Sequence, residues 1–411
     1  MTLIDADQAP HRAPLTALPT GLAPLTGLTA SPLPARPPWQ TPSPQSPSPH
    51  APPPETASPH WHRDDIDPGP EPPARPPQHP ERLTPAPLLE RPWGDGTHSP
   101  LRCPAPARVD PALAAEVDDR LTAWADRIGL HAGHLEEFHA TGFGRLITLA
   151  HPECDDPDLL LVAAQMNAAW WASDDYYADE TDLGAIPEAL PGRLALVSSA
   201  LDPPPPAGPF TAPLSDAVVS DPVLVSLRSA LAHVTRHASA AQVMRVRHTT
   251  HQMYVSWNAY NAWRHAGITP EAWRYLAARQ HDSFYTSMIL IDVVGGYELA
   301  PELFADPLFH RALTQAGTAA VLVNDLTSAA REAGDDPDCN LVLLLAAERG
   351  CGLSEATEAV VALHNDMVDG FEQSRAALAA VPSPELQRFV LGARAWLGGC
   401  LEWHDSSSRY K

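Results

Sequence analysis

Six segments of this chain open with the same two-residue signal, an Asp, Ser or Thr followed by Pro. In such a pair the side-chain oxygen caps the first backbone N–H groups of a helix, and proline takes the first helical position, where its missing N–H is not needed. Apolar residues follow at helical spacing, and alternating strand-like runs are missing after residue 110. The sequence therefore predicts an all-α body of about ten helices or more, with starts at Asp110-Pro111, Asp156-Pro157, Asp221-Pro222, Thr269-Pro270, Asp306-Pro307 and Ser383-Pro384.

The first quarter of the chain differs in composition from the rest. Of the 47 prolines in 411 residues, 27 fall in residues 1–100, among Ala, Ser and Thr and few large apolar side chains. Such a segment cannot bury enough apolar surface to offset the entropy lost on folding, and its prolines favour extended polyproline II conformations. We expect residues 1–106 to form a disordered proline-rich tail and residues 110–411 to form one folded domain.

The charge of the chain excludes one class of partner. Of the formal net charge of −23, −4 lies in residues 1–100, which leaves −19 for the remainder. A body this acidic will not bind nucleic acid non-specifically, because phosphate binding needs clustered Lys and Arg. The acidic excess suits a protein that gathers divalent cations.

The apolar and cysteine patterns favour a cytoplasmic protein outside the membrane. The longest apolar stretch, residues 159–172, is interrupted by Gln165 and Asn167, and the N-terminus lacks the basic flank and apolar core of a secretion signal. The five cysteines are scattered, odd in number and without a Cys-x-x-Cys pair. Neither a disulfide framework nor a zinc cluster is indicated, and a reducing compartment is expected.

An acidic cluster ends the most apolar helix. The segment after Asp156-Pro157 is almost wholly apolar and therefore buried, and it runs into four carboxylates within seven residues. Neighbouring carboxylates repel one another unless they are solvated or bind cations, and clustered oxygens are what Mg²⁺ takes. The alternative is an ordinary solvated helix end. The candidate metal ligands are Asp174, Asp175, Asp179 and Glu180.

A second apolar helix carries a row of three oxygen donors. Asn324, Ser328 and Glu332 lie at i, i+4 and i+8, which puts an amide oxygen, a hydroxyl and a carboxylate on one helix face. Because the row has only one formal charge, it can bind Mg²⁺ and leave the ion positive enough to hold phosphate as well. A polar helix stripe is the alternative interpretation.

Two further groups could bind a diphosphate. On the helix predicted to start at Thr269-Pro270, Asp282 follows Arg279 by three residues, so its carboxylate can orient the guanidinium for bidentate phosphate contact, with Ser283 next to it. A structural Arg–Asp pair would have the same spacing. Arg409 and Tyr410 offer a guanidinium and a phenol at the C-terminus, where polar residues often have no such role.

These motifs together resemble those of the bacterial class I terpene synthases, over about residues 110–411. The resemblance implies a helical barrel in which an aspartate-rich motif and an Asn/Ser/Glu triad face each other and bind three Mg²⁺ ions. By this match the metal ligands are Asp174, Asp175, Asp179 or Glu180, Asn324, Ser328 and Glu332. The diphosphate contacts are Arg279 as sensor, Asp282 as linker, Ser283 as effector, and Arg331, Arg409 and Tyr410 as donors.

The tail, the stretch RYLAARQHDSFYTSMILIDVVGGYEL and the ending RAWLGGCLEWHDSSSRY are similar to the 2-methylisoborneol synthase group. That resemblance implies Mg²⁺-dependent cyclisation of 2-methylgeranyl diphosphate, supplied by a geranyl diphosphate 2-C-methyltransferase, and a homodimer. The group often has cysteines where this chain has Tyr176 and Ala178, and relatives that make 2-methylenebornane leave the product open. Candidate lining residues for an apolar cavity are Phe143, Trp170, Trp171, Tyr254, Trp257, Phe284 and Trp396, although aromatics at helical spacing usually pack the core.

Three other functions fit parts of the sequence. A chain-elongating prenyltransferase would use the same barrel and Mg²⁺ but normally has a second aspartate-rich motif. Glu136-x-x-His139 is half of a di-iron site, and no second Glu-x-x-His is evident. If the chain were a non-enzymatic helical scaffold, both oxygen-donor motifs would have arisen by chance. The cyclase hypothesis requires the carboxylates near residue 175 and the row from residue 324 to meet at one apolar pocket.

Overall fold

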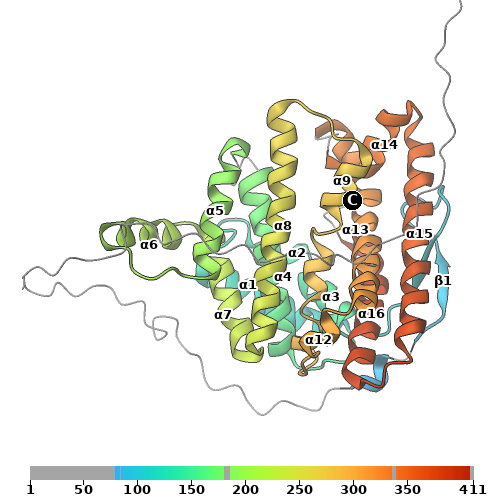
Figure 1. Cartoon of the computed structure of the whole chain (residues 1–411), viewed down its shortest axis with the longest axis horizontal. Helices are drawn as coiled ribbons and strands as arrows, with labels where there is room; N and C mark the ends of the chain where they lie inside the picture. Colours follow the sequence, from blue (N-terminus) through green and yellow to red (C-terminus); the bar gives the residue numbers. More distant parts are fainter. Residues whose placement is uncertain (1–78, 84, 180–185, 336–338, 408–411) are drawn as a thin grey trace, which may run out of the picture. The chain divides into compact units, whose positions relative to one another are not determined.

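The computed structural model describes residues 79–83, 85–179, 186–335 and 339–407, all within one compact unit that spans Ile66–Lys411. Helices make up nearly all of the regular structure in these residues, which confirms the predicted all-α class (Figure 1). In the part of the chain that the structure describes, no single helix is long and apolar enough to cross a membrane. One pair bent by 89°, Gly208–Ser220 with Pro222–His237, meets the criteria by length and composition only.

The main helices follow one another along the chain with short connections. They are α1 Pro111–Ile128, α2 Leu135–Ala140, α3 Phe143–Ala150, α4 Pro157–Asp174, α5 Leu190–Leu201, α6 Thr211–Ser220, α7 Pro222–His237, α8 Ala240–Ala266, α9 Ala272–Arg279, α10 Phe284–Met288, α11 Ile291–Val294, α12 Pro301–Phe304, α13 Pro307–Asp335, α14 Leu341–Arg349, α15 Leu353–Leu378 and α16 Pro384–Ser406.

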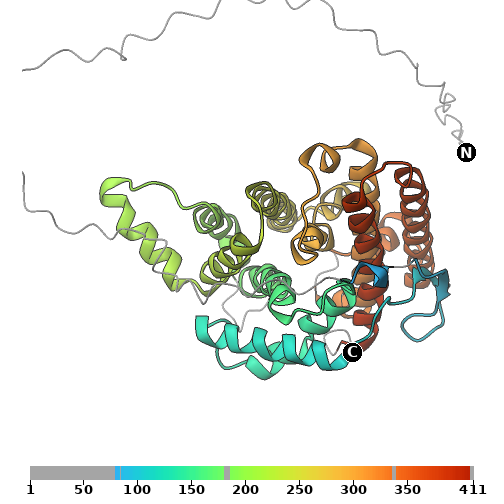
Figure 2. The same ribbon diagram turned by 90° about the horizontal axis from the view of Figure 1, so that it is seen from below.

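Two helices form the centre of the packing. Helix α4 packs against α1, α3 and α7, and helix α13 packs against α15, α16, α10 and α14. The short helix α10 contacts α4, α8 and α13, so the chain between α9 and α10 lies where these three long helices come together. Figure 2 shows the domain from below, where several of the long helices are seen nearly along their axes. The acidic end of α4 and the polar row on α13 therefore belong to helices that are joined through α10.

Five of the six predicted helix starts are confirmed, and one is wrong. The caps Asp110, Asp156, Asp221, Asp306 and Ser383 each accept hydrogen bonds from backbone N–H groups of the helix that follows. Helix α9 does not start at Thr269-Pro270 but at Ala272, after Glu271. The cause is a tertiary contact, because Glu348 of α14 accepts a hydrogen bond from the N–H of Ala272 at 2.9 Å and so caps this end of α9.

The expectation that residues 1–106 form a disordered tail is wrong for the described residues from 79 onward. Residues 80–83 form a 3₁₀ turn, and strands β1 (Leu88–Arg91) and β2 (Leu101–Pro104) pair antiparallel, with Leu88 opposite Pro104. Strand β2 packs on α15 and α16 and buries Leu101 and Cys103 completely. The approach is close enough that a Cβ at Gly398 would lie 2.8 Å from the carbonyl oxygen of Pro104. Prolines at strand ends and in the turn are compatible with this hairpin, which is why composition alone misassigned it.

Candidate active site

A small pocket, partly open to solvent, lies beside the end of α4. It is lined by Trp170, Trp171 and Asp174 of α4, by Met253 and Trp257 of α8, and by Ser283. Burial raises the pKa of the Tyr254 phenol, the hydrogen bond with Ser173 partly opposes this shift, and the nearby charge of Asp174 adds to it. Tyr254 and Ser173 share a hydrogen bond of 2.8 Å at this end of the helix. The first carboxylate of the acidic cluster thus lines a pocket made largely of indole rings.

The described residues that follow Asp174 form a π-helical turn, Asp175–Asp179, and two tyrosines of this turn anchor it. The hydroxyl of Tyr176 accepts a hydrogen bond from the N–H of His131 at 2.8 Å, and the hydroxyl of Tyr177 donates one to Asp221 at 2.9 Å. Asp175 is 7% exposed and is not one of the residues that line the pocket. The structure describes no side chain for Asp179, and Glu180 lies outside the described residues.

The segment from Arg279 to Ser283 is broken where the sequence predicted a continuous helix. Helix α9 ends at Arg279, and Ser283, with φ 51° and ψ −104°, sits in a backbone conformation that costs a non-glycine residue about 1–3 kcal/mol. The predicted contact is nevertheless present, because Arg279 Nη1 donates to Asp282 Oδ2 at 2.8 Å. Asp282, only 1% exposed, also accepts hydrogen bonds from Trp257 Nε1 at 2.9 Å and from Ser283 Oγ at 3.1 Å.

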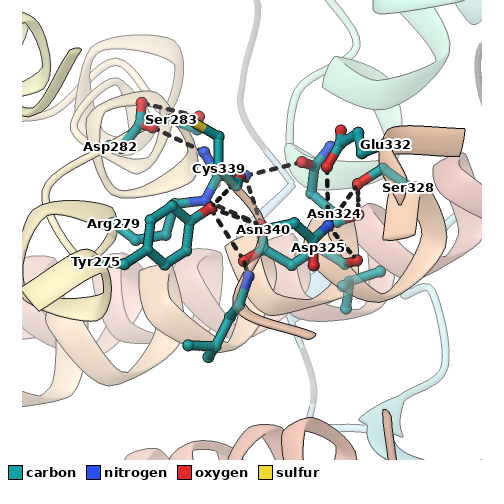
Figure 3. Close-up of polar contacts among 12 residues, drawn as sticks. Tyr275, Arg279, Asp282, Ser283, Asn324, Asp325, Ser328, Glu332, Cys339 and Asn340 are labelled. Carbon is teal, nitrogen blue, oxygen red and sulfur yellow. Dashed lines mark hydrogen bonds and ion pairs between the residues drawn. The ribbon is translucent and has the colours of Figure 1, made fainter. Parts of the chain in front are cut away.

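Arg279 connects this segment to α13. Its Nη2 donates to Asn324 Oδ1 at 2.9 Å and to Asp325 Oδ1 at 2.7 Å, and its Nε donates to the same Asp325 oxygen at 3.0 Å (Figure 3). Burial alone would lower the pKa of Arg279, but the carboxylates of Asp325 and Asp282 outweigh it and hold the pKa well above its ordinary value. The guanidinium at the end of α9 is therefore a permanent cation that is held in a fixed orientation beside the polar row.

The row on α13 forms as the spacing predicted. Ser328 Oγ donates to the carbonyl oxygen of Asn324 at 2.8 Å, which fixes the hydroxyl proton along the helix and leaves the oxygen lone pairs facing outward. Asn340 Nδ2 lies 3.3 Å from Ser328 Oγ and 2.8 Å from Glu332 Oε2, so these two oxygens converge on one atom. Figure 3 shows the row and Asn340 side by side. The row presents hard oxygen donors and a single side-chain charge.

Three residues of this network were not identified from the sequence. Asp325 is 1% exposed and receives, besides Arg279, the N–H of Leu341 at 3.1 Å and the hydroxyl of Tyr275 at 3.2 Å. Asn340 donates to the carbonyl of Asp325 at 2.8 Å. The one available signal was an Asp directly after Asn324 in an apolar helix, because a buried carboxylate requires a cation or several N–H donors. The roles of Tyr275 and Asn340 depend on tertiary packing alone.

The remaining predicted diphosphate contacts have different outcomes. The Arg331 side chain is 52% exposed and lies 3.4 Å from Glu332, at the edge of the row. Arg409 and Tyr410 lie outside the described residues. Among the described side chains, no group of three or more His, Cys, Asp or Glu is placed to hold a metal ion.

The predicted aromatic residues form a connected cluster next to the pocket. Trp170, Trp171 and Trp257 line it directly. Behind Trp171 lie Phe143 and Phe284, with ring centroids 5.5 and 5.8 Å away, and Phe284 in turn lies 6.3 Å from Trp396. Tyr254 contacts Trp257 edge to face at 5.3 Å. The pocket thus combines π faces with a carboxylate and a hydroxyl, which suits an apolar ligand that carries one highly charged group.

Comparison with known proteins gives concordant similarities. The family described as "Terpene synthase family 2, C-terminal metal binding" matches residues 165–369, which include the end of α4 and the whole row on α13. The chain is 34% identical over 315 residues to the 2-methylisoborneol synthase of Saccharopolyspora erythraea, covering 76% of this chain and 89% of that relative.

Solved structures give the same similarity. The 2-methylisoborneol synthase of Streptomyces coelicolor A3(2) in complex with Mg²⁺ and 2-fluoroneryl diphosphate matches with a TM-score of 0.70 and 31% identity, over 82% of this chain and 98% of that chain. The same enzyme in complex with Mg²⁺ and geranyl-S-thiolodiphosphate matches with a TM-score of 0.69 and 32% identity, over 76% and 96% of the two chains.

Proposed function

The chain belongs to the class I terpene synthases, and we propose that it converts 2-methylgeranyl diphosphate to 2-methylisoborneol, a C11 bornane-type alcohol, with release of diphosphate. The observation that carries this proposal is the continuity of the polar network. A pocket walled by indole rings is bordered by Asp174 and Ser283, and Ser283 connects through Asp282 and Arg279 to Asn324. One end of this network borders the aromatic pocket, and the other presents cationic and oxygen-donor groups.

The donor set fits Mg²⁺, the ion bound in the similar solved structures. Asp174, Asp175, and Asp179 or Glu180 would hold it from the end of α4, and Asn324, Ser328 and Glu332 from α13, with three ions in all. Hard oxygens of mixed charge are the ligands that Mg²⁺ takes together with substrate phosphates. When bound, the ions neutralise the charge that develops on the departing diphosphate.

The basic side chains complete the diphosphate site. Arg279 is already oriented by two carboxylates, so its remaining N–H capacity can be directed to diphosphate oxygens with little reorganisation. Arg331, Arg409 and Tyr410 are the proposed further donors. As the allylic C–O bond breaks, its electron pair leaves with the diphosphate, and this set of donors stabilises that charge without any protein base.

The aromatic pocket would protect the carbocation that remains. Indole and phenyl faces attract a positive charge and exclude water until ring closure is complete. One water must then add to the final cation and pass a proton to the released diphosphate or to solvent, which gives the alcohol. Loss of a proton without addition of water would give 2-methylenebornane instead, as the alternative product.

Several further points belong to the same proposal. The catalytic domain spans residues 110–411, and the hairpin of β1 and β2 extends it at the N-terminus. The substrate would be supplied by a geranyl diphosphate 2-C-methyltransferase, and the enzyme would act as a homodimer. A cytoplasmic location belongs to the same proposal, because the scattered, odd number of cysteines in the sequence predicts a reducing compartment.

The test is to incubate the purified protein with geranyl or 2-methylgeranyl diphosphate, with Mg²⁺ or EDTA, and to analyse the volatile products. We expect a C11 bornane-type alcohol from the methylated substrate with Mg²⁺ and no product with EDTA. Chain elongation, or the absence of Mg²⁺-dependent diphosphate release from either substrate, would contradict the proposal.

A further inference from the structure

Asn340, which precedes α14, uses the two ends of its side chain for different purposes. Its Oδ1 accepts a hydrogen bond from the N–H of Val342 at 2.9 Å and so caps α14. Its Nδ2 points the other way and donates to the carbonyl oxygen of Asp325 and to Glu332 Oε2, each at 2.8 Å, with Ser328 Oγ at 3.3 Å (Figure 3). The residue has no exposed surface.

The capping of α14 does not explain why the side chain at position 340 also carries an amide nitrogen. A Ser, Thr or Asp at this position could cap α14 equally well through a side-chain oxygen. Only Asn combines that oxygen with a neutral donor that reaches α13. An Asp would place a second negative charge beside the carboxylate of Glu332, where like charges destabilise each other.

The donor also acts on side chains that belong to the proposed metal site. Ser328 has its proton engaged by the Asn324 carbonyl, so its contact with Asn340 uses one lone pair and leaves the other for a ligand. Glu332 has one carboxylate oxygen held by Asn340, which restricts its side-chain rotamer. Groups that orient a ligand in this way typically change metal affinity by about 10- to 100-fold when they are lost.

We propose that Asn340 is a positioning residue for the Mg²⁺ ligands of α13, holding the oxygens of Ser328 and Glu332 together before the ion binds. The proposal rests on the proposed function, since it assigns Ser328 and Glu332 to the metal site. Asn340 itself contacts neither ion nor substrate. Because Asn340 already restrains the side chains of Ser328 and Glu332, these two ligands lose less conformational entropy when the ion binds.

The experiment uses Asn340→Ser, which keeps a capping oxygen but is too short to reach Glu332. Asp306→Ser is the matched control, because Asp306 caps the N-terminal end of α13, the helix that carries Ser328 and Glu332, at the N–H groups of Leu308 and Phe309. Two quantities are measured for each full-length variant. One is the Mg²⁺ concentration that gives half-maximal turnover of 2-methylgeranyl diphosphate, and the other is the Mg²⁺ concentration dependence of the thermal shift at fixed inorganic diphosphate.

For Asn340→Ser we expect both Mg²⁺ midpoints to rise by about tenfold or more, with turnover at saturating Mg²⁺ reduced far less. Asp306→Ser should leave both midpoints at the wild-type value. If Asn340→Ser fails to fold, Asn340→Thr provides a second capping variant with the same expectation. Wild-type midpoints in a folded position-340 variant would overturn the proposal, whereas a wild-type enzyme without Mg²⁺-dependent turnover would overturn the proposed function itself.

Discussion

Arg279 Nη2 donates a hydrogen bond to Asn324 Oδ1 at 2.9 Å, so the proposed diphosphate sensor directly contacts the first residue of the oxygen row on α13. The same guanidinium is paired with Asp282 and Asp325, which lie on different elements. A ligand that attracts Arg279 therefore acts at once on the turn before α10 and on the proposed metal ligands. This single side chain connects the pocket to the row.

Arg279→Lys should lower kcat/KM by about 100-fold or more, because an ammonium cannot reproduce the planar fork that spans three partners. The matched control is Arg274→Lys on the same helix, since Arg274 is 54% exposed and pairs only locally with Glu271 among the ion pairs described. Steady-state kinetics of both variants provide the measurement. Equal kcat/KM for wild type and Arg279→Lys would exclude Arg279 from substrate binding and ionisation.

Trp257→Phe should broaden the product distribution more than it slows the reaction. The change keeps an aromatic side chain in the pocket wall but removes the Nε1–H donor to Asp282. The ring is then no longer held in place against the turn that contains Asp282. We expect more acyclic and hydrolysed products in the volatile analysis. Trp273→Phe, at a side chain 63% exposed on α9, is the control and should leave the products unchanged. An unaltered product profile in Trp257→Phe would show that this hydrogen bond does not shape the pocket.

Deletion of residues 1–78 should leave turnover and stability largely intact, whereas deletion of residues 1–106 should destabilise the domain. The longer deletion removes β1 and β2 and exposes the surfaces of α15 and α16 that cover Leu101 and Cys103. Each large apolar side chain lost from the core costs about 1.5–3 kcal/mol. Urea unfolding and activity of both truncations provide the comparison. Equal stability of the two would mean that the hairpin is dispensable.

Asp118 makes the stability of the domain depend on pH. Burial raises the pKa of this carboxyl from 3.8 to about 6, although the N–H of Gly144, at 2.6 Å, partly opposes the shift. Because the folded state holds the proton more tightly than the unfolded chain does, the stabilisation is complete below the unfolded pKa and is lost as pH rises through the folded pKa. The loss amounts to about 3 kcal/mol at most.

Asp118→Asn removes this titration and keeps an oxygen that can accept from Gly144. Its stability relative to wild type should therefore increase between about pH 4 and 6 and stay constant above that window. Urea unfolding of the two proteins across this pH range measures the difference. A difference that does not vary with pH would show that Asp118 is not the titrating group.

Local patterns in the sequence predicted the elements but not their partners. Helical spacing predicted the row of Asn324, Ser328 and Glu332. Five of the six pairs of a capping residue and a proline marked real helix starts. Asn340 could not be found in this way, because its role depends on the approach of the chain before α14 to α13. The start of α9 was misplaced for the same reason, since its cap comes from Glu348, 76 residues away in the chain.

We expect the end of α4 and the row on α13 to bind the same group of ions across one pocket. Crystals grown with Mn²⁺ in place of Mg²⁺, and with inorganic diphosphate, would locate the ions by anomalous scattering. The expected result is that ions are coordinated directly by oxygens from the acidic end of α4 and by those of Asn324, Ser328 and Glu332, with diphosphate contacting Arg279. Ions bound at only one of the two motifs, or elsewhere in the protein, would contradict it.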